Sequence, residues 1–593
     1  MVRFILYLNI LFFIIVYVSC EKKTNYSNNA SLKYATVETR CIENGSFIYS
    51  TGYIDQPYII RMPNNKWICF YSKSDTAEGA GDGRIGVSIS ADKGGTWQTM
   101  PDLKDKLAFY ATPFMNANGR IYVFYVFNKD SIRYWDGYWT FHILGELRYV
   151  YSDDNGINWS NSNKIDMPVT NYDSLNLWKG KYQRWWTICK PILANNEMYL
   201  SFTKKTSGID RGEGWVLKST NINSELNINK LDFQFMPSSN FGIRSNTLGN
   251  VQEEHNIVQL NNGGFCCVLR TMLGVPGICY SYDGCKTWTN PVAIKYPNGD
   301  SLRHPKACPR IVKCNNGKYI LWFHNNSNTI GFRNPVWVTG GLEVNGKISW
   351  SQPEVFLYSK NDLKTLSISY PDFIEDGQEF YVTETDKKVA RINKIDRSFF
   401  EQMWSQEYNT DPVTDNVLQT IDSGSLMGKE NYLKKLNFYP NWKGVSVILK
   451  LQNYSFKKDV KLVVLFQKND TDTAIVLRSN NGNYFVDLYE NKNKFITDTL
   501  DFSKIFLNKS NVISFSIDNE DRVLKIMVNG ILCRGNYTSK QGWFRIPTAS
   551  TFDFNLGQTF NINNAYGNLK YFKLYSRGLS TSEQIRETKR LIK

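Results

Sequence analysis

Ser90-Ala91-Asp92-Lys93-Gly94-Gly95-Thr96-Trp97 is the stretch that decides the fold of this chain. Its pattern, S-x-D-x-G-x-T-W, returns at 152–159 with Asn in place of Thr and at 281–288 with Cys in place of the Gly. A weaker relative spans 346–350. The pattern describes a hairpin turn in which Asp and Ser satisfy loop N–H groups, Gly supplies a positive φ and Trp packs beneath. A repeat of one such unit is typical of a β-propeller.

Short β-type runs surround these repeats from about residue 52 to residue 395. Each run is rich in Val, Ile, Tyr, Phe or Trp and is bounded by Gly, Asn or Asp, as at 67–71, 120–127, 198–202, 265–269 and 319–323. Many short strands at regular spacing are typical of sandwiches, barrels and propellers. The sequence therefore predicts an all-β protein, and the repeat selects the propeller.

The repeat is an Asp box and resembles the repeats of the sialidase superfamily. The resemblance implies a sialidase-like β-propeller, with six blades, over residues 46–396. It also implies that the boxes lie at blade turns away from the substrate face, so their Asp residues are structural.

A second β-rich region follows the propeller. Residues 397–422 are expected to form a linker, and residues 423–593 a β-sandwich of the jelly-roll type. Arg522 to Gly530 and Gly567 to Tyr575 resemble strands of laminin-G and concanavalin-like domains. Such domains bind glycans or pack against a partner domain, and both alternatives stay open.

The first twenty residues predict export. Arg3 precedes an apolar run from Phe4 to Val18, which ends at Ser19 and Cys20. The pattern resembles a bacterial lipoprotein signal in which Cys20 is lipidated, and residues 21–45 follow as a tether. We expect a protein anchored to the outer membrane or cell surface, or a secreted one if Cys20 is not lipidated.

Charge and composition narrow the class of molecule that the protein is expected to bind. The formal net charge is +15, but the Lys and Arg residues are spread along the chain and form no nucleic-acid-binding block. An acidic polysaccharide is therefore a better partner than DNA. No metal cluster or phosphate loop occurs, so no cofactor is expected, although a structural divalent cation in the C-terminal domain stays open. Most of the cysteines are interpreted as small core residues.

The resemblance also implies a site. Sialidases hold a carboxylate with three Arg, use a Tyr nucleophile and activate it with a Glu. Glu254 or Glu253 matches the Glu, Arg270 the second Arg and Arg333 the third Arg. Tyr370, in Ser369-Tyr370-Pro371-Asp372, matches the nucleophile. Permanently charged Arg is suited to holding a carboxylate, and a phenol needs a base or a cation nearby to react.

One position departs from that pattern. The first Arg of the family falls on Asp55, which is assigned to the substrate-binding set with its charge reversed. The acid/base is not fixed either, because Asp75, Glu78 and Asp82 all precede the first box.

Three histidines suggest a different reaction. His255, His304 and His324 fall near the Arg candidates in the sequence. Elimination across C4–C5 of a uronate needs a neutralised carboxylate, a base and an acid. Arg270 and Arg333 could neutralise the carboxylate, Tyr370 and His255 could act as base and acid, and His304 and His324 could bind substrate.

The sequence thus leaves three hypotheses. The first is a polysaccharide lyase acting on uronate-containing chains of the ulvan type. The second is a retaining exo-sialidase using Tyr370 and Glu254. The third is a glycan-binding protein without catalysis.

Overall fold

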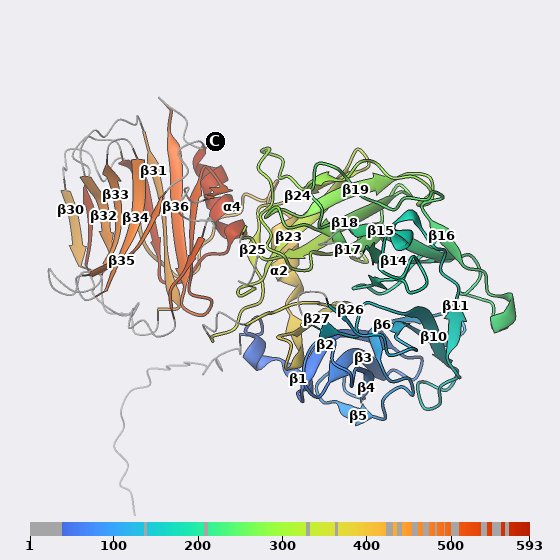
Figure 1. Cartoon of the computed structure of the whole chain (residues 1–593). Coiled ribbons are helices and arrows are strands. Elements are labelled where there is room, and N and C mark those ends of the chain that lie inside the picture. Colours follow the sequence, from blue (N-terminus) through green and yellow to red (C-terminus); the bar gives the residue numbers. More distant parts are fainter. Residues whose placement is uncertain are drawn as a thin grey trace, which may run out of the picture. The chain divides into compact units, whose positions relative to one another are not determined.

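The first two-thirds of the chain folds into six antiparallel sheets, the blades of a propeller (Figure 1). The structure is a computed structural model. It describes residues 38–592 except 136–138, 207–211, 328–332, 362–365, 423–430, 436–441, 453–459, 466–473, 481–482, 491–492, 500–508, 535–542, 548–558 and 564–568. Cys20 and the expected tether up to residue 37 lie outside the described residues.

Blades 1 to 3 follow one another in sequence. Blade 1 consists of β2 (Tyr53–Arg61), β3 (Trp67–Ser74), β4 (Arg84–Ser90) and β5 (Gln98–Met100). Blade 2 consists of β6 (Ala108–Met115), β7 (Ile121–Phe127), β10 (Glu146–Ser152) and β11 (Asn163–Ile165), with a small hairpin of β8 (Tyr134–Trp135) and β9 (Trp139–Thr140). Blade 3 consists of β12 (Trp185–Trp186), β13 (Ile192–Ala194), β14 (Glu197–Lys205), β15 (Gly212–Ser219) and β16 (Gln234–Met236).

Blades 4 to 6 complete the propeller. Blade 4 consists of β17 (Glu253–Gln259), β18 (Phe265–Arg270), β19 (Gly277–Ser281) and β20 (Val292–Ala293). Blade 5 consists of β21 (Arg310–Lys313), β22 (Tyr319–Phe323), β23 (Trp337–Val344), β24 (Lys347–Trp350) and β25 (Glu354–Val355). Blade 6 consists of β26 (Phe373–Asp376), β27 (Glu379–Thr385) and β28 (Ala390–Ile395), and its fourth strand is β1 (Ser46–Tyr49).

Pairing between the two ends of the propeller closes it. Strand β1 pairs antiparallel with β28, so that Ser46 lies opposite Ile392. Strand β2 also contacts β27 of blade 6 and β6 of blade 2. The prediction of an all-β, six-bladed propeller is therefore confirmed by the sheet topology of the described residues.

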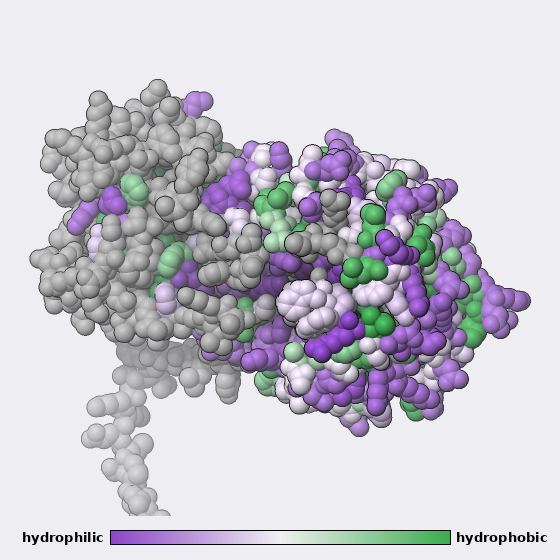
Figure 2. Space-filling view, viewed as in Figure 1, coloured by the Kyte–Doolittle hydropathy of each residue, from purple (hydrophilic) through white to green (hydrophobic). Residues whose placement is uncertain are grey.

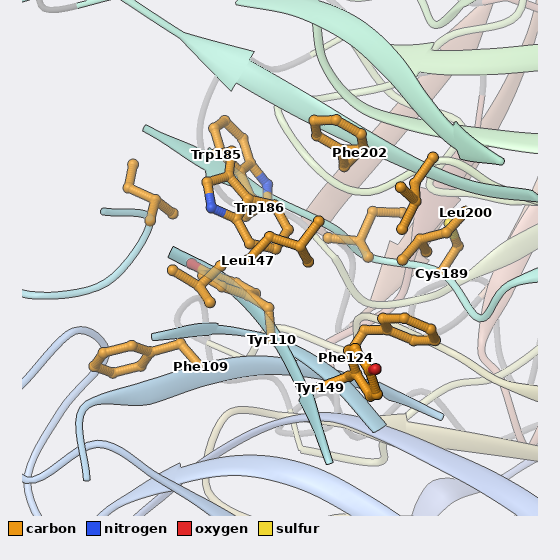
Figure 3. Packing of buried hydrophobic residues seen from close by; sticks show 14 of the residues in the cluster. Phe109, Tyr110, Phe124, Leu147, Tyr149, Trp185, Trp186, Cys189, Leu200 and Phe202 are labelled. Carbon is orange, nitrogen blue, oxygen red and sulfur yellow. The ribbon is translucent and has the colours of Figure 1, made fainter. Parts of the chain in front are cut away.

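Aromatic packing fills the space between neighbouring blades. Figure 3 shows the cluster shared by blades 2 and 3, in which Tyr110 and Phe124 of blade 2 face Trp185, Trp186 and Phe202 of blade 3. Large aromatic side chains bury much apolar area for each residue, which suits a fold whose sheets meet face to face.

The Asp boxes form the turns that the sequence predicts. In the first box the Asp92 carboxylate accepts hydrogen bonds from the backbone N and the hydroxyl of Thr96, both at 2.8 Å. Ser90 Oγ accepts from Gly94 N at 2.8 Å, and the φ of Gly94 is +87°. The boxes in blades 2 and 4 repeat these contacts through Asp154 and Asp283.

The innermost strands carry a second shared feature, a β-bulge. The strand register shifts after Asp55 in β2, after Phe109 in β6 and after Glu253 in β17. The residue that follows each shift has a positive φ, with values of +56° (Gln56), +60° (Tyr110) and +53° (Glu254). Tyr370, just before β26, also has a positive φ, of +51°. A bulge re-aims a side chain out of the alternating pattern of the strand.

A β-sandwich follows the propeller. One sheet consists of β29 (Val417–Asp422), β41 (Leu569–Tyr575), β31 (Gly444–Leu451), β36 (Asn511–Asp518), β37 (Val523–Val528), β38 (Ile531–Leu532) and β39 (Trp543–Arg545). The other consists of β30 (Asn431–Lys435), β40 (Thr559–Asn563), β32 (Val460–Leu465), β33 (Ala474–Asn480), β34 (Asn483–Glu490) and β35 (Asn493–Thr499).

Helices lie before and after the sandwich strands. Helix α2 (Arg397–Trp404) begins in the segment expected as a plain linker, and it buries Phe400, Met403 and Trp404. Helix α4 (Thr581–Ile592) follows the last strand. The remaining helices among the described residues are short: η1 (Ile42–Asn44), α1 (Asn171–Ser174) and η2 (Ile228–Lys230).

Hydrophilic residues lie on the surface of the propeller and the described cysteines lie in the core. Hydrophilic residues predominate on the visible face of the propeller, with scattered apolar residues (Figure 2). Cysteines of the described chain are buried, as expected for core residues. None of the helices in the described part is long and apolar enough to span a bilayer.

Candidate active site

Tyr370 and Glu254 come together in the structure although 116 positions separate them in sequence. The Tyr370 hydroxyl donates a hydrogen bond to Glu254 Oε1 at 2.8 Å. The same carboxylate oxygen accepts from Arg270 Nη1 at 2.7 Å. Burial, the Glu254 charge and the Asp55 charge raise the pKa of Tyr370 well above its usual range, while Arg270 and Arg333 oppose the rise. A phenol in this setting keeps its proton until a base removes it during reaction, and Glu254 is placed to do so.

Glu253 gives Arg270 a second carboxylate partner. Arg270 Nη2 forms a short ion pair with Glu253, and Lys205 Nζ lies 3.2 Å from the other oxygen of that carboxylate. Although burial acts in the opposite direction, Arg270 and Lys205 lower the pKa of Glu253 to about 2. Glu253 is therefore a permanent anion that holds Arg270, whereas Glu254 faces Tyr370.

Arg333 also reaches the tyrosine segment. Its guanidinium donates to Ser369 Oγ at 2.7 Å and to the backbone oxygen of Lys306 at 2.9 Å. Both partners are neutral oxygens, so the charge of Arg333 is not cancelled by these contacts. The predicted second and third Arg thus both lie close enough to Tyr370 to influence the pKa of its phenol.

Asp55 lies in the same region but carries different partners. Its carboxylate accepts from the Tyr53 hydroxyl at 2.8 Å and pairs with Lys387 Nζ at 2.6 Å. Lys387 also stands over the Tyr370 ring, 4.4 Å from its centroid. Burial and the nearby Glu78 raise the pKa of Asp55 to about 6, against the effect of Lys387. The position expected to hold a cation therefore holds an acid paired with a cation from another blade.

Of the three acidic candidates before the first box, Glu78 is the one that approaches this group. Glu78 Oε2 lies 3.8 Å from Lys387 Nζ, and its side chain is 38% exposed. Although burial acts in the opposite direction, Lys387, His142 and Arg333 lower the pKa of Glu78. By contrast, Asp75 pairs with Arg84 at 2.6 Å, and Asp82 accepts from the backbone N of Asp75 at 2.7 Å.

The three histidines are buried beneath the site. His304 Nε2 bonds the backbone oxygen of Ala307 at 2.8 Å, and its ring stacks on that of His324 at 5.6 Å. His324 Nε2 bonds the backbone oxygen of Ile368 at 2.9 Å. Burial lowers the pKa of His304 to about 3 and holds the pKa of His324 well below its usual value. This pair supports the segment that carries Tyr370.

His255 lies between blades 3 and 4. Its Nδ1 is 3.0 Å from Thr203 Oγ1, and its ring packs against Gly214, where an added Cβ would lie 2.3 Å from the imidazole. Burial lowers the pKa of His255 to about 3. A histidine in this state is neutral at ordinary pH and is held by packing.

The sequence missed Lys387 and Lys205, and it could not choose among the three acids. Lys387 lies on the turn after β27, and Lys205 ends β14, so neither falls within a predicted motif. In the described part of the chain, no group of three or more His, Cys, Asp or Glu side chains could hold a metal ion. The site is thus built from two Arg, two Lys, a Tyr and several carboxylates.

No family model matches the sequence, and no curated protein matches it either. Among solved structures, a Hadza microbial sialidase is 16% identical, with 58% of this chain and 66% of that one covered and a TM-score of 0.43. Trypanosoma rangeli sialidase in complex with 2,3-difluorosialic acid is 13% identical, with 92% and 96% covered and a TM-score of 0.43. The intramolecular trans-sialidase from Ruminococcus gnavus is 12% identical, with 60% and 98% covered and a TM-score of 0.42.

Proposed function

We propose that this protein is a carbohydrate-active enzyme that acts on a sugar bearing a carboxylate, with Tyr370 as nucleophile and Glu254 as its base. The observation that carries the proposal is the 2.8 Å hydrogen bond from the Tyr370 hydroxyl to Glu254, with Arg270 on the same carboxylate oxygen. Nucleophile and base within hydrogen-bond reach, with the base oriented by a third group, is the arrangement that covalent catalysis requires.

A retaining glycosidase uses this arrangement in two steps. Tyr370 Oη attacks the anomeric carbon while Glu254 takes the phenolic proton, and the bond to the leaving oxygen breaks. Glu78 is placed to protonate that oxygen and later to activate water, because it is the accessible carboxylate of the group. Its lowered pKa opposes the acid role in the free protein, and the negative charge of a bound carboxylate raises it again.

The cations explain why the substrate should be acidic. Arg333 bonds neutral oxygens, and Arg270 lies beside the nucleophile. Two guanidinium groups near one phenol favour a ligand with a carboxylate next to the reacting carbon. A neutral phenol also approaches such a ligand without the repulsion that an anionic carboxylate nucleophile would meet.

A uronate-specific polysaccharide lyase of the ulvan type is the second candidate, and Asp55 is the observation that favours it. Asp55 replaces one Arg of the sialidase pattern, and its pKa of about 6 lets it hold a proton near neutral pH. In this reaction Tyr370, deprotonated through Glu254, would remove the C5 proton, and a protonated acid would serve the leaving oxygen at C4.

One assay separates the candidates. The purified protein is incubated with sialyl glycans, ulvan and other uronate polymers, while free sialic acid, new reducing ends and the absorbance of unsaturated uronates are followed. Release of an acidic sugar without new absorbance supports the glycosidase, and new absorbance supports the lyase. Full activity of Tyr370→Phe on any of these substrates would contradict both, and binding without turnover of any substrate would leave a glycan-binding protein.

We also propose that the enzyme works outside the cell on an acidic polysaccharide, held to a membrane through lipidated Cys20. The support is the apolar run before Cys20 and the polar segment after it. Expression in a bacterial host with labelled palmitate tests this. Label should enter the wild-type protein, and Cys20→Ser should lose the label and leave the membrane fraction. Equal labelling of both proteins would overturn the anchor.

A further inference from the structure

Lys387 brings a positive charge to the place where the sialidase pattern expects an arginine and the chain has Asp55. Its Nζ lies 2.6 Å from Asp55 Oδ2 and 3.8 Å from Glu78 Oε2. It also stands 4.4 Å from the centroid of the Tyr370 ring. Lys387 of blade 6 therefore contacts the Tyr370 ring directly, whereas Arg270 of blade 4 contacts Glu254, the carboxylate to which Tyr370 donates.

The backbone around Lys387 is fixed at the junction of blades 6 and 1. The Lys387 carbonyl accepts from Ile54 N at 3.1 Å, and Lys387 N donates to Thr385 Oγ1 at 2.9 Å. Thr385 Oγ1 in turn donates to the Ile54 carbonyl at 3.0 Å. Because both ends of the turn are bonded to β2 or to each other, the backbone of Lys387 is fixed, and the ion pair with Asp55 holds its ammonium.

The ammonium retains capacity for a ligand. It has three N–H donors, and the 3.8 Å separation from Glu78 is an ion pair beyond hydrogen-bond reach. Its side chain is 21% exposed, whereas the Asp55 side chain is 1% exposed. The acid is thus enclosed and the cation faces outward, which is the order expected if Asp55 orients Lys387 for a partner that arrives from solvent.

We propose that Lys387 is a substrate-binding residue that completes a three-cation site with Arg270 and Arg333, and that it binds the carboxylate of an acidic sugar. The proposal deepens the function proposed above and rests on it. An ammonium is a compact point charge rather than a bidentate fork, so it recognises the charge of the ligand more than the exact direction of its oxygens. Asp55 acts as a positioning residue that holds the ammonium over Tyr370.

Binding of free monosaccharides by the full protein tests the inference without any turnover. The probes are glucuronate and N-acetylneuraminate, with glucuronamide as the uncharged match of the first, measured by calorimetry at pH 7. Lys387→Met should weaken binding of the acidic probe by tenfold or more and leave glucuronamide binding unchanged. The control is Lys388→Met, because Lys388 is the next residue and is exposed. It should bind both probes as the wild type does. Lys387→Arg keeps the charge and should retain most of the affinity, which covers the case in which Lys387→Met fails to fold.

The outcomes distinguish the two proposals. Equal affinity of wild type and Lys387→Met for the acidic probe, or equal loss for acidic and neutral probes, overturns the role of Lys387. A second outcome is that Lys387→Met loses affinity for the acidic probe alone while the wild type turns over no glycan. That result keeps the binding role of Lys387 and overturns the proposal that the protein is an enzyme. A wild type that binds neither acidic probe overturns both.

Discussion

Blades 1 and 4 both have a β-bulge in the inner strand, but they differ in which blade supplies the cation that pairs with the acid there. Both inner strands bulge, and the residue in the bulge has a φ of +56° in blade 1 and +53° in blade 4. In blade 4 the acids Glu253 and Glu254 meet a cation of their own blade, Arg270. In blade 1 the acid Asp55 meets a cation from blade 6. The bulge fixes where a side chain points, and the residue placed there decides the chemistry.

Substituting Glu254 in blade 4 should have the largest effect on catalysis. Glu254→Gln removes the base that takes the Tyr370 proton, so kcat on the substrate found by the assay above should fall by about 10²–10⁴-fold. KM should change less, because Gln keeps the shape of the side chain. Glu379→Gln is the control, since Glu379 begins β27 at the turn after β26 and pairs there with Lys394. A Glu254→Gln variant with more than a third of wild-type kcat would remove Glu254 from the mechanism.

Removing the cation should also lower the free energy of unfolding more in blade 4, where it is Arg270, than in blade 1, where it is Lys387. Arg270→Met leaves buried Glu254 without its cation and leaves buried Glu253 with Lys205 alone, and breaking a buried pair in this way costs about 3–5 kcal/mol. Lys387→Met leaves one buried acid whose pKa is already raised to about 6 and which can take up a proton. The free energy of unfolding, measured with urea at pH 6, should therefore fall further for Arg270→Met. The reverse order would mean that blade 1 depends on its cation more than blade 4 does.

The sequence predicted blade 4 well and blade 1 poorly, and the reason is distance along the chain. Glu254, Arg270 and the box at 281–288 lie within one blade, so their order in the sequence is their order in space. Lys387 is 332 positions from Asp55, and the turn that carries it resembles any exposed hairpin. The propeller itself was predictable because each Asp box is local. The closure that joins blade 6 to blade 1 is long-range and leaves no local signal.

The two blades should respond to pH in opposite directions. The folded protein raises the pKa of Asp55 to about 6, so between about pH 4 and pH 6 the unfolded chain binds fewer protons there than the folded one. Asp55 therefore lowers the free energy of unfolding as pH rises through that window, by about 2–3 kcal/mol in total. Glu253 has its pKa lowered to about 2, so its contribution is present above pH 4.5 and is lost as pH falls towards 2.

Difference measurements isolate these contributions from the rest of the protein. Urea unfolding of wild type and Asp55→Asn across pH 4–7 should give a difference in free energy that moves in favour of the variant as pH rises. The same experiment with Glu253→Gln across pH 2–5 should move in favour of the wild type as pH rises. Parallel curves for Asp55→Asn and wild type would show that folding does not raise the pKa of Asp55.

The smallest effects are expected at the turns of the Asp boxes, where the boxes of the two blades differ at one of the five pattern positions. Gly94 in blade 1 and Cys285 in blade 4 occupy the same place in the box, with φ values of +87° and +69°. Gly94→Cys puts a side chain into that conformation, and the new Cβ would lie 3.1 Å from Ile392 Cδ1, so stability should fall by about 1–3 kcal/mol. Cys285→Gly relieves the same strain but removes a buried side chain, so the change should stay within about 1 kcal/mol. Urea midpoints of both variants measure this. A loss at Cys285→Gly as large as that at Gly94→Cys would show that the packing of the thiol, and not the turn, stabilises the box of blade 4.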